Sequence, residues 1–260
     1  MEYVVKQAGR SQWMTLVELL IRRDLKVRYR GSFLGYLWSM LNPLLMMTVM
    51  TVVFSQAMRV DLPHYPIYIL SGLLAWNMLA QSTNLGVRSF VDNAALLKKV
   101  SIPSWIFSSA TIGSAFVHAC FAFVPYVVIA LVTGFSFSLG LLQLPLVMIL
   151  FYFFVQGIVL TLATLNVFFR DVGHVVEPIL QIVFYASPVL YPVSALPDKY
   201  RAFLAFNPVT HYLAGFRSCL YDFPPLSLIE WGTMVGLSLA SIALGSFVYH
   251  RGRDRFLYYL

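Results

Sequence analysis

Long apolar stretches alternate with short polar segments along this 260-residue chain. A helix that crosses a membrane needs about 20 consecutive, mainly apolar residues. Six stretches of suitable length are predicted as spans, and they cover residues 33–57, 65–87, 105–133, 141–167, 175–192 and 228–249. Hydrophobic residues make up 59% of the chain and charged residues 11%, so we predict an all-α integral membrane protein whose spans use most of the sequence.

Basic residues flank these spans unevenly. Alternating spans place 14 of the 18 Lys and Arg residues on one side and four on the other, and those four are Arg59, Lys199, Arg201 and Arg217. Basic residues near the ends of spans stay in the cytosol. We therefore predict that both termini are cytosolic, and we attribute the net charge of +7 to membrane topology rather than to nucleic-acid binding.

The segment 12–30 has a helical pattern of its own. Trp13, Leu16, Val17 and Leu20 form one apolar stripe at helical spacing, and basic residues project from the opposite side. Such a pattern is typical of a helix that lies on a membrane surface. We predict a cytosolic interface helix that leads into the first span.

The cytosolic segment between the second and third spans is predicted to contain a short exposed helix over residues 92–100. Asp92 is a suitable N-cap for it, and the two lysines at its other end suit the negative pole of the helix dipole. This helix is the predicted contact for a driving ATPase. The residues predicted to make that contact are Asp92, Leu96, Leu97, Lys98 and Lys99.

Residues 193–226 contain apolar runs that charged residues interrupt. A seventh span here would place the C-terminal arginines outside, against the charge rule, whereas six spans keep them in the cytosol. We therefore predict that 196–224 forms two short helices that enter the outer leaflet and return. The break is predicted at Asn207-Pro208, because the residue before a proline disfavours helix. Irregular backbone at that depth must be buried in protein or line a wet cavity, which indicates an outer gate.

The chain lacks the residue clusters that catalysis requires. Its 11 acidic residues are scattered and its five histidines lie in separate segments, so no catalytic or metal site is predicted. Cys120 and Cys219 give neither a disulfide framework nor metal-ligand spacing. No Gly-Lys dipeptide occurs, so the chain has no P-loop for ATP. We predict no cofactor in this chain, with ATP and Mg²⁺ bound by a partner subunit.

Aromatic residues are concentrated in 184–223. They fit either an aromatic belt at the membrane interface or a path for a sugar chain, whose C–H faces stack on rings. For the second interpretation, the residues predicted to line the glycan path and the outer gate are Tyr185, Tyr191, Phe206, Asn207, Pro208 and Tyr212.

Five segments, taken together and in order, carry a family resemblance. They read RYRGSFLGYLWSMLNP (28–43), NAALLKKVSIP (93–103), TLNVFFRD (164–171), SPVLYP (187–192) and FNP (206–208). The series resembles the ABC-2 type permeases that export polysaccharides. It is most similar to O-antigen and teichoic-acid exporter permeases, and less so to capsule exporters.

The resemblance implies a homodimer of six-span subunits in the bacterial cytoplasmic (inner) membrane. Two copies of a cytosolic ABC ATPase subunit would dock on it, and the chain itself would not be an enzyme. A lipid-linked glycan would enter near the inner leaflet, and its sugar chain would be threaded outward. The interface helix and the 92–100 helix would receive the movement of the ATPase, while 196–224 would form the outer gate.

Three arginines are candidates for binding the lipid pyrophosphate at the cytosolic entrance: Arg28, Arg30 and Arg170. A guanidinium group can bind phosphate through two parallel hydrogen bonds. Alternatively, Arg170 pairs with Asp171 or Glu177 or only anchors the chain, and the basic cluster before the first span binds anionic membrane lipids.

Two other functions stay open on the sequence. An ABC-2 permease for another lipid or for a drug would have fewer aromatic residues along its path. An integral-membrane enzyme acting on lipid-linked sugars would be active as the isolated chain. A neighbouring gene for a soluble ATPase, among glycosyltransferase genes, would separate a polysaccharide exporter from both.

Overall fold

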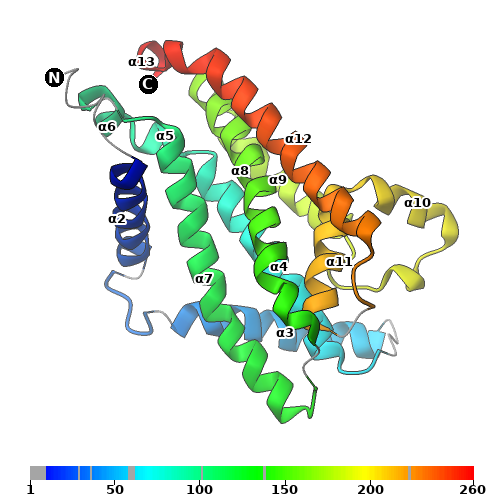
Figure 1. Cartoon of the computed structure of the whole chain (residues 1–260). Coiled ribbons are helices and arrows are strands. Elements are labelled where there is room, and N and C mark those ends of the chain that lie inside the picture. The colour runs from blue at the N-terminus through cyan, green and yellow to red at the C-terminus, as the bar shows by residue number, and fades with distance from the viewer. Residues whose placement is uncertain are drawn as a thin grey trace.

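The computed structural model describes residues 10–28, 30–35, 37–57, 62–100, 102–136, 139–221 and 224–260, and every regular element in these ranges is a helix (Figure 1). In chain order the elements are α2 (Arg10–Arg28), α3 (Leu37–Ala57), α4 (Tyr65–Gly86), α5 (Ser89–Asp92), α6 (Ala94–Lys99), α7 (Trp105–Val132), η1 (Leu139–Gln143), α8 (Leu144–Phe168), α9 (Val172–Tyr185), η2 (Val193–Ala195), α10 (Asp198–Phe206), α11 (Pro208–Leu220), α12 (Leu228–Gly252), η3 (Arg253–Arg255) and α13 (Phe256–Tyr259).

Within these ranges, three stretches are long and apolar enough to cross a membrane: Trp105–Val132, Leu139–Phe168 and Leu228–Arg255. Two shorter apolar helices are Leu37–Val53 and Val172–Tyr185. The all-helical composition and the long apolar helices agree with the predicted integral membrane protein. The number of spans stays a prediction.

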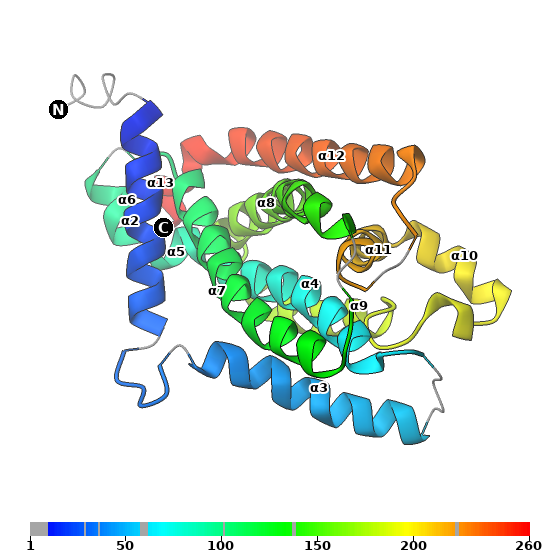
Figure 2. The same ribbon diagram turned by 60° about the horizontal axis from the view of Figure 1, so that its bottom comes forward.

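α8 and α12 run side by side through the molecule (Figures 1 and 2). The hydroxyl of Ser238 donates to the Leu150 carbonyl at 2.8 Å. One turn further along, the hydroxyl of Ser241 donates to the Phe154 carbonyl at 2.7 Å. At Gly157 an added Cβ would overlap the backbone of Ser241, so the two helices touch through their main chains. Close contacts and interhelical hydrogen bonds of this kind hold helices together in lipid, where the hydrophobic effect between them is absent.

α2 lies alongside the first half of α7 (Figure 1). Leu20 is buried against three residues of α7, and the rest of the apolar stripe packs around it. The approach is close, because a Cβ at Gly113 of α7 would lie 2.6 Å from Ile21 Cδ1. Leu20 therefore faces protein, whereas Trp13, Leu16 and Val17 are only partly buried, and the placement of α2 on the membrane surface stays a prediction. A stripe shows that one face of a helix is apolar, but it does not say whether lipid or protein covers it.

α3 begins at Leu37 rather than at residue 33. Before it, Gly31 and Gly35 adopt φ values of 76° and 47°, in the left-handed region that favours glycine. These two residues turn the chain between α2 and α3. The helix then crosses α4 and α7 obliquely instead of running along them (Figures 1 and 2).

Asp92 does not cap a helix over 92–100, so that prediction was wrong. Asp92 is the last residue of α5, and Asn93 is the N-cap of α6. Asn93 Nδ2 donates to the Ser89 carbonyl at 2.8 Å, and this local hydrogen bond holds the turn between the two short helices. The exposed helix runs from Ala94 to Lys99.

The fifth predicted span is shorter than expected, because α9 ends at Tyr185 and not at residue 192. Pro188 disfavours helix at Ser187, which stops it. A 14-residue helix is about 21 Å long, less than the roughly 30 Å of a hydrocarbon core. Residues 186–191, which we call the strap, continue the chain without helix.

Two short helices follow, as predicted for the segment 196–224. α10 ends at Phe206 and α11 begins at Pro208. Asn207 lies between them, and its Oδ1 accepts from the Val209 backbone N–H at 3.0 Å to cap α11. The predicted break at Asn207-Pro208 is confirmed. Asp222 and Phe223, at the end of the predicted segment, lie outside the described residues, as does Arg59.

Carbonyl groups of the strap are paired with side chains of α4, α11 and the α10–α11 break. The four pairs are Ala186 with Asn207 at 3.3 Å, Val189 with Arg217 at 2.7 Å, Leu190 with Tyr65 at 2.6 Å and Tyr191 with Tyr68 at 2.8 Å. A carbonyl without a donor is costly where water is absent. These hydrogen bonds therefore allow irregular backbone to pack between helices.

Arg217 makes the central contact with the strap. It is only 4% exposed, and its guanidinium carbon lies 3.8 Å from the centre of the Tyr68 ring. Gly72 of α4 leaves room for this arrangement, because a Cβ there would lie 2.8 Å from the Val189 carbonyl oxygen and 3.0 Å from Arg217 Nη2. The charge rule assigned Arg217 to the outer side without saying what surrounds it, and the structure buries it in protein.

Replacing Gly157 with valine should force α8 and α12 apart. The new side chain would collide with the Ser241 backbone, and overpacking of this kind costs about 1–3 kcal/mol. Gly236→Val on α12 is the matched control, because an added Cβ there meets nothing within 4 Å. Thermal unfolding in detergent should show a clearly lower midpoint for Gly157→Val alone. Equal midpoints for the two variants would contradict the close helix contact.

Replacing Arg217 with alanine should destabilise the strap. The Val189 carbonyl would lose its donor, and a buried polar group left unpaired costs about 1–3 kcal/mol. Tyr68→Phe removes only one hydroxyl donor and should cost less, about 1 kcal/mol. Lys199→Ala, at an exposed residue of α10, is the control. Unfolding midpoints should fall in the order Lys199→Ala, Tyr68→Phe, Arg217→Ala; a wild-type midpoint for Arg217→Ala would rule out this role.

Candidate functional site

One face of α4 borders three adjoining cavities of about 510, 430 and 410 Å³. The residues of α4 that line them recur at helical spacing, and they are Leu73, Trp76, Asn77, Ala80, Gln81, Asn84 and Leu85. The first two cavities share Arg28, and the second and third share Asn42, Pro43 and Asn77. We call this continuous feature the α4 groove; α2, α3, α7 and α9 form its other walls.

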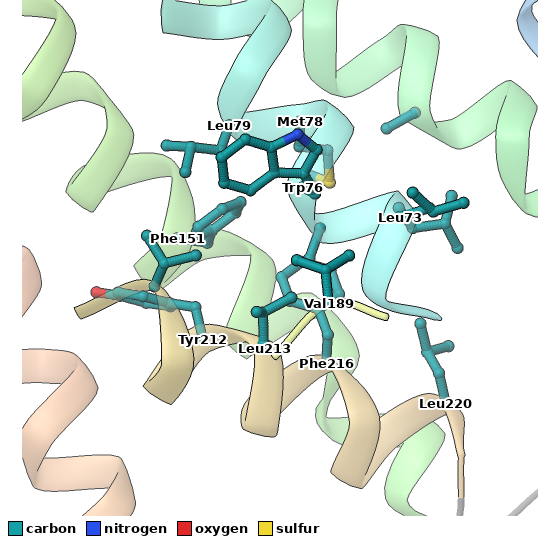
Figure 3. Packing of buried hydrophobic residues seen from close by; sticks show 14 of the residues in the cluster. Leu73, Trp76, Met78, Leu79, Phe151, Val189, Tyr212, Leu213, Phe216 and Leu220 are labelled. Carbon is teal, nitrogen blue, oxygen red and sulfur yellow. The ribbon is translucent and has the colours of Figure 1, made fainter. Parts of the chain in front are cut away.

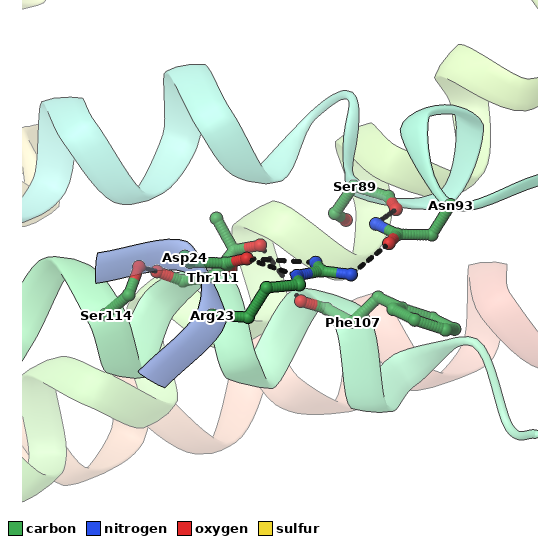
Figure 4. Close-up of polar contacts among 7 residues, drawn as sticks. All are labelled: Arg23, Asp24, Ser89, Asn93, Phe107, Thr111 and Ser114. Carbon is green, nitrogen blue, oxygen red and sulfur yellow. Dashed lines mark hydrogen bonds and ion pairs between the residues drawn. The ribbon is translucent and has the colours of Figure 1, made fainter. Parts of the chain in front are cut away.

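The end of the α4 groove beside α5 is polar (Figure 4). Arg23 of α2 donates through Nη1 to Asn93 Oδ1 at 3.2 Å and through Nε to Asp24 Oδ1 at 3.0 Å. Thr111 and Ser114 of α7 line the same end. The hydrogen bond from Arg23 connects α2 directly to the turn between α5 and α6, so a displacement of that turn would reach α2.

The middle of the α4 groove contains a short chain of polar side chains. Arg28 Nη1 donates to Gln81 Oε1 at 2.8 Å, and Gln81 Nε2 lies 3.4 Å from His118 Nδ1. Trp38 and Asn42 of α3 form the facing wall. Because Gln81 is neutral, its hydrogen bond orients Arg28 without cancelling the positive charge of the guanidinium group.

Amides and aromatic rings line the far part of the α4 groove. The rings of Trp76 and Phe184 lie 5.1 Å apart, centre to centre. Tyr185 is at the edge and is 65% exposed. The polar residues of this part are Asn42, Asn77, Asn84, Glu177 and Gln181.

This lining suits a ligand that carries many hydroxyl groups. Each primary amide has two N–H donors and a carbonyl acceptor, so it can bind a hydroxyl in either sense. The aromatic rings offer apolar faces beside these amides. The lining residues of α4 extend over about three turns from Leu73 to Leu85, so the groove offers polar groups along its length rather than at one point.

The predicted ATPase contact is an exposed helix. All residues of α6 lie at least partly at the surface. Leu96 is 40% exposed, whereas Leu97 is half-buried and packs against the apolar clusters around Phe90 and Phe107. Lys98 and Lys99 are both exposed at the end of the helix.

Asp92, included in the predicted contact, lies at the polar end of the α4 groove. Partial burial raises the pKa of its carboxyl group, and the nearby Arg88 guanidinium offsets part of that rise. Asp92 is therefore an exposed residue at the end of α5, beside the α4 groove, and is not part of α6.

The three arginines that were candidates for pyrophosphate binding have different surroundings. Arg28 lines the α4 groove. Arg30 is exposed in the turn after α2. Arg170 follows α8, and its Nη2 donates to the Tyr259 carbonyl of α13 at 3.3 Å. Which of these candidates binds pyrophosphate stays a prediction; of the three, Arg28 lines the α4 groove.

The residues predicted for the glycan path and outer gate have three kinds of surroundings: the surface near α9 and α10, the α10–α11 break and the apolar core. Tyr185 and Phe206 are exposed, the latter by 87%, and the Tyr191 hydroxyl donates to the Tyr185 carbonyl at 3.1 Å. Asn207 and Pro208 form the α10–α11 break described above.

Tyr212 belongs to neither an exposed surface nor a cavity. It is fully buried, and Figure 3 shows it beside Phe151 in the apolar core. Its hydroxyl contacts the Met234 carbonyl at 2.9 Å and Ser238 Oγ at 2.7 Å, both on α12. The prediction that Tyr212 lines the exit was wrong, because a tyrosine near a predicted interface can equally anchor two helices from inside.

Sequence reasoning missed the amides of the α4 groove. Asn77, Gln81 and Asn84 recur at intervals of four and three residues inside a predicted span. Polar side chains repeated on one face of an apolar helix indicate a face turned away from lipid. That signal was present in the sequence.

The chain matches the ABC-2 type transporter family over residues 15–221. It is 30% identical to the O-antigen export system permease protein RfbA of Myxococcus xanthus over 250 residues, which cover 94% of this chain and 95% of that protein. It is 31% identical to the O-antigen export system permease protein RfbA of Klebsiella pneumoniae, covering 86% and 90% of the two chains. Identity to the polysialic acid transport protein KpsM of Escherichia coli is 24%, covering 75% and 77%.

Each of these relatives is a membrane component of a system named for glycan export or transport, and the family match extends from α2 to the end of α11. The motifs identified in the sequence fall within the same range. The chain therefore belongs to the ABC-2 type transporter family.

Proposed function

We propose that this chain is the permease subunit of an ATP-driven exporter that moves a lipid-linked polysaccharide across the cytoplasmic membrane of a bacterium. The α4 groove is the observation that carries this proposal. Its amides and rings match the hydroxyls and C–H faces of a sugar chain, and the relatives of the chain are named as O-antigen permeases. ATP hydrolysis belongs to a separate ABC ATPase subunit.

The sugar chain passes along the α4 groove one sugar unit at a time. Asn77, Gln81 and Asn84 present amides at successive turns of α4. Such a series exchanges one hydroxyl for the next without a single tight site, which favours movement over retention. Arg28 binds the lipid pyrophosphate where the groove passes α2, because a guanidinium group is suited to phosphate.

A second copy of the chain closes the groove. Val175, Ile179, Ile182 and Tyr185 recur at helical spacing on α9, and each is at least half exposed. This apolar face lies next to the far part of the groove, which Tyr185 also lines. A homodimer that pairs these faces would enclose the sugar path between two α4 grooves.

The proposal also gives roles to the spans, the short helices α10 and α11, and the cytosolic helix α6. Six segments cross the membrane with both termini in the cytosol, α9 doing so together with the strap because it is too short alone, and α10 with α11 forms the outer gate. The ATPase subunit docks on α6. The turn before α6 transmits the movement through Asn93 to Arg23 of α2, because these two side chains are hydrogen-bonded.

Replacing Asn77 and Asn84 together with leucine should slow export while the fold is kept. Each lost amide removes hydrogen bonds worth about 0.5–1.5 kcal/mol, so export by the double variant should fall about tenfold. Thr233→Leu on α12, outside the groove, is the control. Export is measured as surface glycan in cells that carry the cognate ATPase. Wild-type export by a stably expressed double variant would show that the sugar chain does not pass along the α4 groove.

The single variants Leu96→Asp and Leu97→Asp should distinguish a loss of ATPase docking from a loss of stability. Leu96 is exposed, so its replacement should abolish co-purification of the ATPase and leave the unfolding midpoint unchanged. Leu97 packs against two apolar clusters, so its replacement should lower the midpoint as well. Retention of the ATPase by Leu96→Asp would exclude α6 as the main contact.

A further inference from the structure

A second groove lies on the opposite side of α7 from the α4 groove. It consists of two cavities of about 480 and 600 Å³ that share Trp105, Ser109 and Tyr152. One cavity lies between α8 and α12, and the other extends beneath α2. We call the pair the α2–α12 groove.

Helical spacing separates the two grooves. Trp105 and Ser109 of α7 line the α2–α12 groove, whereas Thr111, Ser114 and His118 line the α4 groove. At 3.6 residues per turn these two sets lie on opposite faces of α7. The α2–α12 groove is therefore not part of the proposed sugar path.

The part of the α2–α12 groove beneath α2 is mainly apolar. Trp13, Met14, Val17 and Ile21 form its α2 side. Glu18 is the acid on this side, and it is paired with Arg22 at 2.6 Å. An apolar channel of this kind suits a hydrocarbon chain.

The other part is lined by α7, α8 and α12, and it mixes apolar side chains with a few polar ones and one arginine, Arg253. Gln156 is 7% exposed, accepts from Ser109 Oγ at 3.3 Å and donates to Ser108 Oγ at 3.1 Å. His250 and Arg253 are exposed at the end of α12, which we call the mouth of the groove. Arg253 makes an exposed ion pair through Nε with Asp254 at 3.5 Å.

We propose that the α2–α12 groove binds an anionic phospholipid of the surrounding bilayer. Its phosphate lies against His250 and Arg253, and one acyl chain extends beneath α2 between Trp13 and Trp105. The groove combines an apolar cavity beneath α2 with an exposed arginine and a histidine at its other end, so it can hold an acyl chain and contact a phosphate at the same time. The mouth lies at the end of the molecule that holds α5, α13 and the C-terminus (Figure 1).

Brominated lipids provide a direct test, because bromine on an acyl chain quenches tryptophan fluorescence only at close range. Trp38, Trp76 and Trp231 are replaced with phenylalanine, so that Trp13 and Trp105 report on the groove. The protein is placed in phosphatidylcholine nanodiscs that contain a small, equal fraction of either brominated phosphatidylglycerol or brominated phosphatidylcholine. Brominated phosphatidylglycerol should quench more strongly.

Charge at the mouth should determine that preference. Arg253→Ala combined with His250→Ala should reduce the phosphatidylglycerol preference about fivefold, the effect expected for loss of one basic contact. Arg255→Ala removes a nearby exposed charge that does not line the cavity, and it should keep the preference. Equal quenching by the two lipids, or an equal loss in Arg255→Ala, would overturn the proposal.

If the three phenylalanine substitutions prevent folding, native mass spectrometry of the protein with all five tryptophans replaces fluorescence. Phosphatidylglycerol should then stay bound more than phosphatidylcholine, and Arg253→Ala with His250→Ala should remove the difference. Retention of both lipids to the same extent would contradict the proposal. Neither readout depends on transport, so this test stands apart from that of the proposed function.

Discussion

The pairing of the strap's carbonyl groups is the constraint on which the part of the structure around α10 and α11 depends. Residues 186–191 leave the helix of α9 and yet pack among other helices, so their carbonyls need donors from elsewhere. Arg217, Tyr65 and Tyr68 supply three of them and Asn207 a fourth. Since these donors come from α4, α11 and the α10–α11 break, the same bonds fix the position of both short helices.

α4 connects this constraint to the proposed function. Its first two turns donate to the strap through Tyr65 and Tyr68, and its later turns carry the amides of the α4 groove. Most of its other residues are buried in the core. A helix held this firmly can present Asn77, Gln81 and Asn84 in fixed register, which a path for a repeating polymer requires.

Local patterns in the sequence predicted much of this architecture. Apolar runs located the long helices, and the Asn207-Pro208 pair located a real break, because proline acts on its immediate neighbours. The N-cap of α6 was misplaced by one residue, since Asp92 and Asn93 are both good caps and the bond from Asn93 to Ser89 decides between them. The ABC-2 resemblance was confirmed by the family match.

Contacts between distant segments could not be predicted from the sequence. The sequence did not show that Arg217 is buried against Tyr68 and hydrogen-bonded to the Val189 carbonyl. Tyr212 was predicted to line the exit, and only the structure shows that its hydroxyl group is hydrogen-bonded to Ser238 in the core. The amides of α4 are the exception, because their spacing alone marks one face of the helix as polar.

The central claim is that a sugar chain moves along the α4 groove. A photoreactive amino acid at position 84 or 181 tests it most directly, with position 239 on the exposed face of α12 as the reference. During export driven by the cognate ATPase, illumination should attach the lipid-linked glycan at positions 84 and 181 and not at 239. Active export with no glycan attached at 84 or 181, or with more attached at 239, would contradict the account.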